Sequence, residues 1–157
     1  MCIRDRIYST FLDQFDNMKH LFHGHTYTGN PIAASLSLTN LQLYEKYDLI
    51  QNVKRKSRIF QKRINEFLDL ELVGDVRTKG MVMGIELVSN RKRKTPLETN
   101  KSINKLVFEE GRKHNVYFRT LGNIVMLVPP LAISSNEINF LIDGTLKTIK
   151  GITSELK

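Results

Sequence analysis

The hydrophobic pattern of the chain changes at Leu72, and this change constrains the fold more than any other feature. Before it, apolar residues recur three or four positions apart, which is typical of helices. After it, two strand-like runs at 72–78 and 81–88 are separated by Lys79-Gly80. Such a pair of runs around a glycine turn predicts a β-hairpin whose second strand is mostly buried.

Further helices and strands are predicted after this hairpin. Helical spacing predicts a helix over 100–113, and a second strand pair is expected at 116–120 and 124–128, around a Leu-Gly-Asn turn. Ser134 and Glu137 have the spacing of a capping box, which predicts that a final helix begins there. This part of the chain is therefore expected to form an α+β unit of about four strands with two helices against one face.

The spacing of apolar residues before Leu72 predicts mainly helices. It predicts a helix over 7–18 and a short strand at 19–22. A helix is predicted over 31–47 and a second helical stretch over 48–68. The join near Asp48 is compatible with either two helices or one bent helix.

These patterns divide the chain into four parts. Residues 1–6 fit none of the patterns and are expected to be an artefact. Residues 7–30 are interpreted as the end of a preceding domain, and residues 31–71 as connecting helices. Residues 72–157 form the predicted α+β unit.

Composition excludes some classes of protein. No apolar run approaches the about 20 residues that span a bilayer, so a membrane protein is not expected. The single Cys2 excludes an internal disulfide, and by elimination the cytoplasm is the expected location.

The formal net charge of +8 makes nucleic-acid binding a function to consider. No aromatic residues are interleaved with the basic clusters, so we interpret them as a solvated helix face and an exposed loop: Lys54, Arg55, Lys56, Arg58, Lys62, Arg63, Arg91, Lys92, Arg93 and Lys94.

The segment from His23 to Pro31 (HGHTYTGNP) is the richest in polar groups. Asn30 is placed to cap a helix, and Pro31 suits the first helical position. A polar, glycine-jointed loop before a helix is suited to an anion such as phosphate. An ordinary capped loop explains the same residues equally well. His23 and His25 have no third ligand nearby in sequence, so a metal site is not expected.

Arg119 is the second candidate for a binding residue, because it lies at a strand end beside a tight turn. An arginine there can hold a substrate carboxylate with two parallel hydrogen bonds. Taken alone, an exposed structural arginine is the simpler interpretation. Arg77 lies beside Asp75, and a structural ion pair is expected between them.

Three stretches in this order resemble the class III aminotransferases, which depend on pyridoxal phosphate. They are HGHTYTGNP at 23–31, VGDVRTKGMVMGIELV at 73–88 and FRTLGNIVMLVPPL at 118–131. The loop is most similar to the biotin-pathway branch, which passes an amino group from S-adenosylmethionine to 8-amino-7-oxononanoate. The omega-amino-acid transaminases more often have histidine at the position of Asn30, and they are the alternative within the family.

The resemblance implies an α/β fold, with this chain forming the C-terminal small domain and the last edge of the large domain of a fold-type I transferase. It implies that Thr26 donates to the cofactor phosphate across the interface of a homodimer, with His25 beside the cofactor. Gly24 and His25 would line the substrate channel through their backbones, and Arg119 would pair with the carboxylate of the oxononanoate substrate. It also implies that the Schiff-base lysine lies before residue 7 of this sequence, so the chain alone is expected to be inactive.

Overall fold

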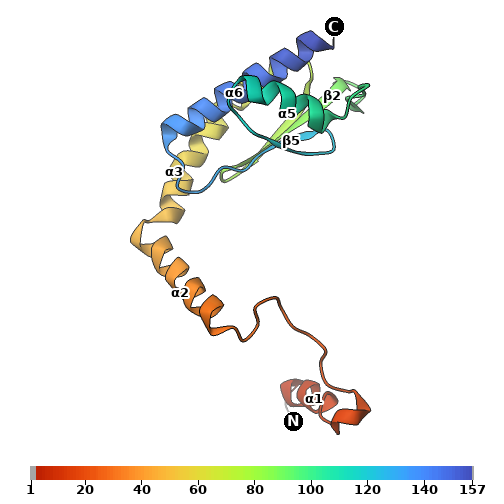
Figure 1. The fold of residues 1–157 in the computed structure, drawn as a ribbon, viewed down its shortest axis with the longest axis vertical. Helices are drawn as coiled ribbons and strands as arrows, with labels where there is room; N and C mark the ends of the chain where they lie inside the picture. The colour runs from red at the N-terminus through yellow and green to blue at the C-terminus, as the bar shows by residue number, and fades with distance from the viewer. Residues whose placement is uncertain (1–2, 157) are drawn as a thin grey trace. The chain divides into compact units, whose positions relative to one another are not determined.

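The computed structural model describes residues 3–156, and it divides the chain between Gln42 and Leu43 into two units (Figure 1). The first unit holds helix α1 (Ile3–Thr10), a 3₁₀ turn (Phe15–Asn17) and most of helix α2 (Pro31–Lys46). The second unit holds the remaining elements and a hydrophobic core. Cys2 lies outside the described residues.

An antiparallel sheet forms the centre of the second unit. Its strands are β1 (Val73–Lys79), β2 (Val82–Asn90), β4 (Arg119–Leu121) and β5 (Ile124–Leu127), in the order β1-β2-β5-β4, and the two-residue strand β3 (Thr95–Pro96) pairs with β2. The two expected hairpins are present as β1–β2 and β4–β5, and they meet through β2 and β5.

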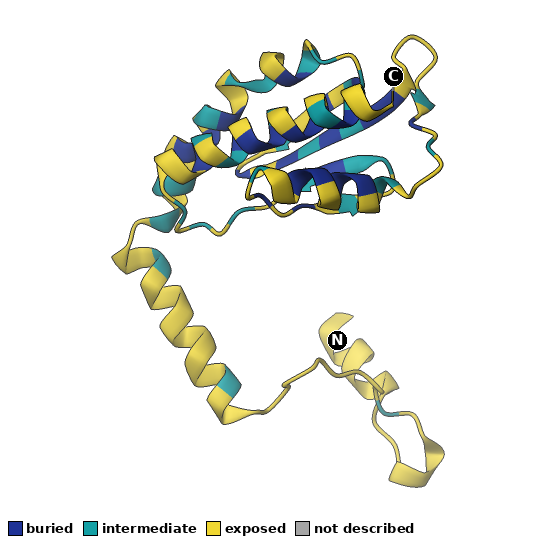
Figure 2. Cartoon of the chain, turned by 45° about the horizontal axis from the view of Figure 1, so that its top comes forward, coloured by how far each residue is buried: buried dark blue, intermediate teal, exposed yellow. Residues whose placement is uncertain are grey.

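Four helices belong to this unit: α3 (Leu49–Lys62), α4 (Ile64–Leu68), α5 (Ile103–Lys113) and α6 (Ser135–Glu155). Their buried side chains share one hydrophobic core with alternate residues of the sheet (Figure 2), among them Phe60, Met83, Val107, Leu127 and Ile142. Burial of one sheet face against helices is the expected solution for an antiparallel sheet. The fold class is therefore as predicted, with α3 joining the two helices expected on the sheet.

The capping box predicted for α6 is present. The Ser134 hydroxyl accepts a hydrogen bond from the Glu137 backbone N–H at 3.2 Å, and the Glu137 carboxylate accepts from the Ser134 N–H at 2.8 Å. These bonds satisfy donors that the first turn of a helix leaves free. They fix the point where the chain leaves the Pro129-Pro130 segment and crosses the core as α6.

The first unit has no comparable core. None of the residues of α2 is buried (Figure 2), and large apolar side chains such as Ile32, Leu36 and Leu41 are more than half exposed. The start of α2 is nevertheless well defined, because the Asn30 side chain accepts hydrogen bonds from the backbone of Ile32 at 3.0 Å and Ala33 at 3.1 Å. The predicted helix start at Asn30-Pro31 is confirmed.

Two predictions for the first unit are wrong. The expected strand at 19–22 is irregular chain, and the expected helix over 7–18 begins earlier and ends at Thr10. Asp13 explains where helix is lost, since its carboxylate accepts hydrogen bonds from the Gln14 backbone at 2.8 Å and the Asn17 side chain at 2.7 Å. Such local bonds compete with the helical ladder.

The basic helix face also needs correction. Lys56 belongs to the cluster expected to be solvated, but it is only 8% exposed, and its ammonium donates to the Leu131 carbonyl at 3.3 Å.

Three further expectations concern other parts of the chain. The helical stretch over 48–68 is broken at Arg63, where α3 ends and α4 begins. The expected pair of Arg77 and Asp75 is confirmed at 3.5 Å. Within residues 3–156, no helix is long and apolar enough to cross a bilayer.

Candidate functional site

The conformation of the loop from His23 to Pro31 is fixed by backbone and side-chain hydrogen bonds within the loop. Thr28 accepts a hydrogen bond from the His25 backbone N–H through its hydroxyl at 2.9 Å, and its own N–H donates to the His25 carbonyl at 2.9 Å. Tyr27 and Gly29 both adopt left-handed backbone, at φ 67° and 72°. Glycine adopts this conformation without strain, and the chain can therefore turn sharply into α2.

Thr26 is the hydroxyl that this arrangement leaves available. Its side chain makes no hydrogen bond within the described residues, whereas those of Thr28 and Asn30 are engaged in the loop and the helix cap. A hollow of about 440 Å³ lies along Thr26–Pro31 and the first two turns of α2, where Ala33, Ala34 and Ser37 line it. The arrangement offers a free donor beside small side chains.

The chemistry of this hollow fits a phosphate group. The nine loop residues contain no carboxylate, and the first turn of α2 is free of acidic residues. A hydroxyl donor at the positive end of a helix favours an anion. The loop therefore has the groups that the cofactor-phosphate prediction requires, with Thr26 as the available side chain.

The other two loop candidates are exposed. Gly24 has open space around the position that a Cβ would take, so the chain there is accessible to a ligand. His25 and His23 approach each other with their Nε2 atoms 3.2 Å apart. Within residues 3–156, no group of three or more histidine, cysteine or acidic side chains is arranged to hold a metal ion.

Arg119 begins the edge strand β4 in the second unit. It pairs with Met126 of β5, next to the turn at Gly122, whose φ of 59° explains the glycine. Because β4 lies at the edge of the sheet and pairs with β5, the position of Arg119 depends on the β4–β5 hairpin and on the pairing of β5 with β2. Asn123 strengthens that pairing, since its side chain donates to the Leu87 carbonyl at 2.9 Å and its carbonyl accepts from the Leu87 N–H at 2.8 Å.

An apolar hollow of about 540 Å³ adjoins Arg119. The other residues that line it are Tyr117, Leu121, Met126 and Val128. The Arg119 guanidinium forms no ion pair within the described part of the chain. A permanently charged, bidentate donor at one end of an apolar surface is suited to an organic acid with an aliphatic body.

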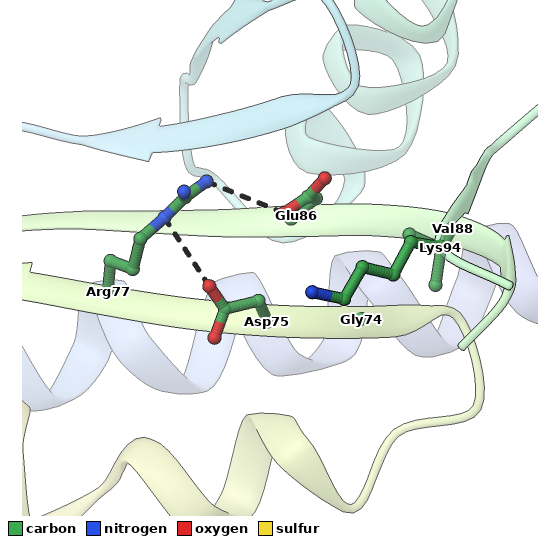
Figure 3. Close-up of a pocket in the computed structure, with 6 residues that line it drawn as sticks. All are labelled: Gly74, Asp75, Arg77, Glu86, Val88 and Lys94. Atoms are coloured by element: carbon green, nitrogen blue, oxygen red, sulfur yellow. Dashed lines mark hydrogen bonds and ion pairs between the residues drawn. The ribbon is translucent and has the colours of Figure 1, made fainter. Parts of the chain in front are cut away.

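A second arginine on the same sheet differs in its surroundings. Arg77 of β1 lies 3.5 Å from Asp75 and 3.4 Å from Glu86, and Lys94 reaches over the same hollow of about 310 Å³ (Figure 3). Two carboxylates already face Arg77, so an added anion would meet a balanced charge there. Within residues 3–156, Arg119 is the arginine of this face that forms no ion pair with a carboxylate.

Thr26 belongs to the first unit and Arg119 to the second. Within the second unit, the sequence identified Arg119 but missed the apolar residues beside it. The signal for them is the two-residue alternation of β5, where Val125 and Leu127 enter the core and Met126 and Val128 must face the other side.

Solved structures that share this fold of mixed helix and sheet are transaminases. The family model of the class III aminotransferases matches residues 3–149. The chain therefore belongs to the class III aminotransferases, which are pyridoxal-phosphate-dependent in general.

Individual relatives agree with this assignment. The adenosylmethionine-8-amino-7-oxononanoate aminotransferase of Geobacter sulfurreducens is 40% identical over 148 residues, which are 94% of this chain and 33% of that protein. The crystal structure of the enzyme of the same name from Methanocaldococcus jannaschii matches with a TM-score of 0.80 and 40% identity, over 94% of this chain and 34% of that one. A probable gamma-aminobutyrate transaminase 3 of Oryza sativa subsp. indica is 29% identical over 99% of this chain and 30% of its own. The chain spans about a third of the length of these relatives.

Proposed function

We propose that this chain serves in an aminotransferase that passes the amino group of S-adenosylmethionine to 8-amino-7-oxononanoate. Support comes from the 40% identity to relatives of that name and from the arrangement around Arg119. The observation that carries the proposal is a charged guanidinium beside an apolar hollow that forms no ion pair with any residue the structure describes. It matches an acceptor that has a carboxylate at the end of an aliphatic chain.

In this proposal the loop of the first unit holds the cofactor. The Thr26 hydroxyl donates to the phosphate, in a homodimer whose partner subunit holds the rest of the cofactor. His25 lies beside the cofactor, and Gly24 presents its backbone to the substrate. Bound pyridoxal phosphate supplies the aldehyde and the electron-withdrawing ring that amino transfer requires.

The role of Arg119 is to bind and orient the acceptor. Its guanidinium donates two hydrogen bonds to the acceptor carboxylate, and the apolar hollow excludes water from the aliphatic chain. Charge-assisted hydrogen bonds contribute about 1.5–3 kcal/mol each, so loss of one corresponds to roughly 10- to 150-fold in affinity.

The experiment that tests the proposal joins residues 7–157 to the first two thirds of the Geobacter sulfurreducens relative. The hybrid is assayed for acceptor conversion with S-adenosylmethionine and, in parallel, for transfer from gamma-aminobutyrate to pyruvate. Transfer from S-adenosylmethionine is expected. Exclusive use of gamma-aminobutyrate would instead support the alternative raised by the rice relative.

Arg119→Ala in the hybrid is expected to raise the KM for 8-amino-7-oxononanoate at least tenfold with little change in the KM for S-adenosylmethionine. Arg77→Ala is the matched control, because it removes an arginine from the same sheet face that already has carboxylate partners. Equal effects of Arg119→Ala on both substrates would contradict the carboxylate role.

Thr26→Val in the hybrid is expected to weaken pyridoxal phosphate binding, whereas Thr26→Ser keeps the hydroxyl and restores it. Equilibrium dialysis against the cofactor measures the effect. The 157-residue chain alone is expected not to transaminate, and a visible absorption titration with pyridoxal phosphate that produced a lysine-bound cofactor band would refute that expectation.

A further inference from the structure

The strand that carries Arg119 is short and lies at the edge of the sheet. β4 has three residues and pairs with β5, where Arg119 lies opposite Met126 and Thr120 lies opposite Val125. Val125 is 1% exposed and belongs to the core. Because successive residues of a strand point to opposite faces, Thr120 lies on the core face and Arg119 on the open face. The direction in which the Arg119 side chain leaves the sheet therefore depends on how β4 is held from its core side.

Helix α5 holds this core side at two points. The first point is apolar, since Phe118, which directly precedes β4, is 2% exposed and its ring lies against Gly111 of α5. A Cβ at Gly111 would lie 2.9 Å from the Phe118 Cε2 atom, so the glycine allows this close approach. The second point is polar, since the Thr120 hydroxyl donates a hydrogen bond to the side-chain oxygen of Asn104 at 3.3 Å.

The two points are separated along both the helix and the strand. Asn104 and Gly111 are seven positions apart, which is about two turns and about 10 Å along one side of a helix. Phe118 and Thr120 are about 7 Å apart along an extended chain. The chain reverses direction after α5 at Asn115, which has a left-handed backbone with φ 57°. With a single point of contact β4 could turn about its own axis, and the second point opposes this rotation.

The polar contact can be removed without opening the core. Asn104 is exposed and Thr120 is half-buried, whereas the Phe118 ring is part of the core cluster. We propose that Asn104 is a positioning residue for acceptor binding, because through Thr120 it holds β4 in the orientation in which Arg119 receives the acceptor carboxylate. The inference rests on the proposed function, since it takes Arg119 as the carboxylate-binding residue and adds what fixes its orientation.

The size of the effect follows from the strength of one hydrogen bond. A neutral hydrogen bond between side chains shifts an equilibrium by about two- to twelvefold. When a binding site has its competent orientation only part of the time, the apparent affinity falls in proportion to that fraction. Loss of the bond between Asn104 and Thr120 is therefore expected to weaken acid binding by at most about twelvefold, with the fold intact.

The test compares two ligands of the same length, hexanoate and hexanamide, on the 157-residue chain. Hexanamide lacks the carboxylate, so the ratio of the two affinities measures the charged contact with Arg119. Nuclear magnetic resonance titration of the methionine methyl groups gives both affinities, because Met126 lines the hollow beside Arg119 and Met18 of the first unit is an internal control. The wild type is expected to bind hexanoate at least about tenfold more tightly than hexanamide.

Asn104→Ala and Thr120→Val are each expected to lower the hexanoate affinity by about two- to twelvefold and to leave the hexanamide affinity unchanged. The double variant should lose no more than either single variant, because both changes remove the same bond. Thr120→Ser keeps the hydroxyl and should restore the wild-type ratio. Ser89→Ala is the matched control, since it removes a hydroxyl bond of 3.1 Å to the Pro96 carbonyl from β2 of the same sheet.

Equal losses of hexanoate and hexanamide affinity in Asn104→Ala would show a merely structural role and overturn the inference, as would additive losses in the double variant. Arg119→Gln separates this inference from the proposed function. If Arg119→Gln abolishes the preference for hexanoate and Asn104→Ala leaves it at the wild-type value, the carboxylate role stands and the positioning role fails. If the wild type does not prefer hexanoate, or Arg119→Gln keeps that preference, both fail.

Discussion

A contact between α6 and the chain that leads into β4 gives the sharpest stability prediction. Gly144 is buried in α6, and a Cβ there would lie 2.6 Å from the Val116 Cγ1 atom and 3.2 Å from Cγ2. Alanine in a helix interior is favoured over glycine by about 1 kcal/mol. Overpacking costs about 1–3 kcal/mol, and a 2.6 Å approach to a stiff β-branched side chain belongs in the upper part of that range.

Gly144→Ala is therefore expected to lower the free energy of unfolding by about 1–2 kcal/mol in the wild-type background. The sign should reverse when Val116→Ala is already present, because the two methyl groups that clash are then absent. In that background the helix-propensity gain remains, so Gly144→Ala should stabilise by about 1 kcal/mol. The two substitutions are thus expected to be coupled by about 2–3 kcal/mol.

Urea unfolding of the wild type, both single variants and the double variant, followed by circular dichroism at the helical band, measures this coupling. The slope of the free energy with urea should stay constant across the four proteins, so that midpoints report stability. A stabilising effect of Gly144→Ala in the wild type, or the same sign in both backgrounds, would show that Val116 does not determine the effect. Because Val116 leads directly into Tyr117 and Arg119, the same contact supports the start of β4.

Three further predictions concern other parts of the chain. Ser134→Ala removes the capping box of α6 and is expected to cost about 1 kcal/mol in urea unfolding. The pKa of the Glu66 carboxyl lies below its ordinary value of 4.5 because the Arg63 guanidinium donates a hydrogen bond to it. The pair therefore stabilises the fold fully above about pH 4.5, and this contribution is lost as the pH falls through the lowered pKa of Glu66. Arg63→Met should therefore lower stability by at most about 1 kcal/mol at pH 7, because the Glu66 side chain is 44% exposed and water screens the pair, and flatten the acid dependence below pH 4.5. Labelled DNA or RNA should not shift with this chain at physiological ionic strength, and a salt-dependent shift would contradict the solvated-surface interpretation.

The sequence predicts elements whose signals are local. The hairpin at Lys79-Gly80 and the capping box at Ser134 depend on residues within a few positions of each other, and both are present. The start of α2 follows equally directly from Asn30, whose side chain bonds the next two backbone amides. In each of these cases the residues that determine the structure are adjacent in the sequence.

The predictions that failed concern structure that depends on residues far apart in the sequence. Lys56 lies on the polar face of α3 by its spacing, yet it is buried because the Leu131 carbonyl, 75 positions away, accepts its hydrogen bond. The run at 19–22 has strand-like composition, but a strand exists only where another strand pairs with it. The hollow beside Arg119 is likewise missed, because it forms only when β4 and β5 pair in one register.

The two proposed binding residues therefore depend on different kinds of support. Arg119 stands on a sheet whose other face is covered by a buried core, so its position follows from residues 43–157 themselves. Thr26 precedes a helix that has no buried residue, so its loop is shaped by hydrogen bonds within the loop and by the Asn30 cap alone. Carboxylate binding at Arg119 should consequently persist in this chain by itself, whereas phosphate binding at Thr26 should require surroundings that cover α2. Titration of the chain with a linear acid and with pyridoxal phosphate separates these two dependences.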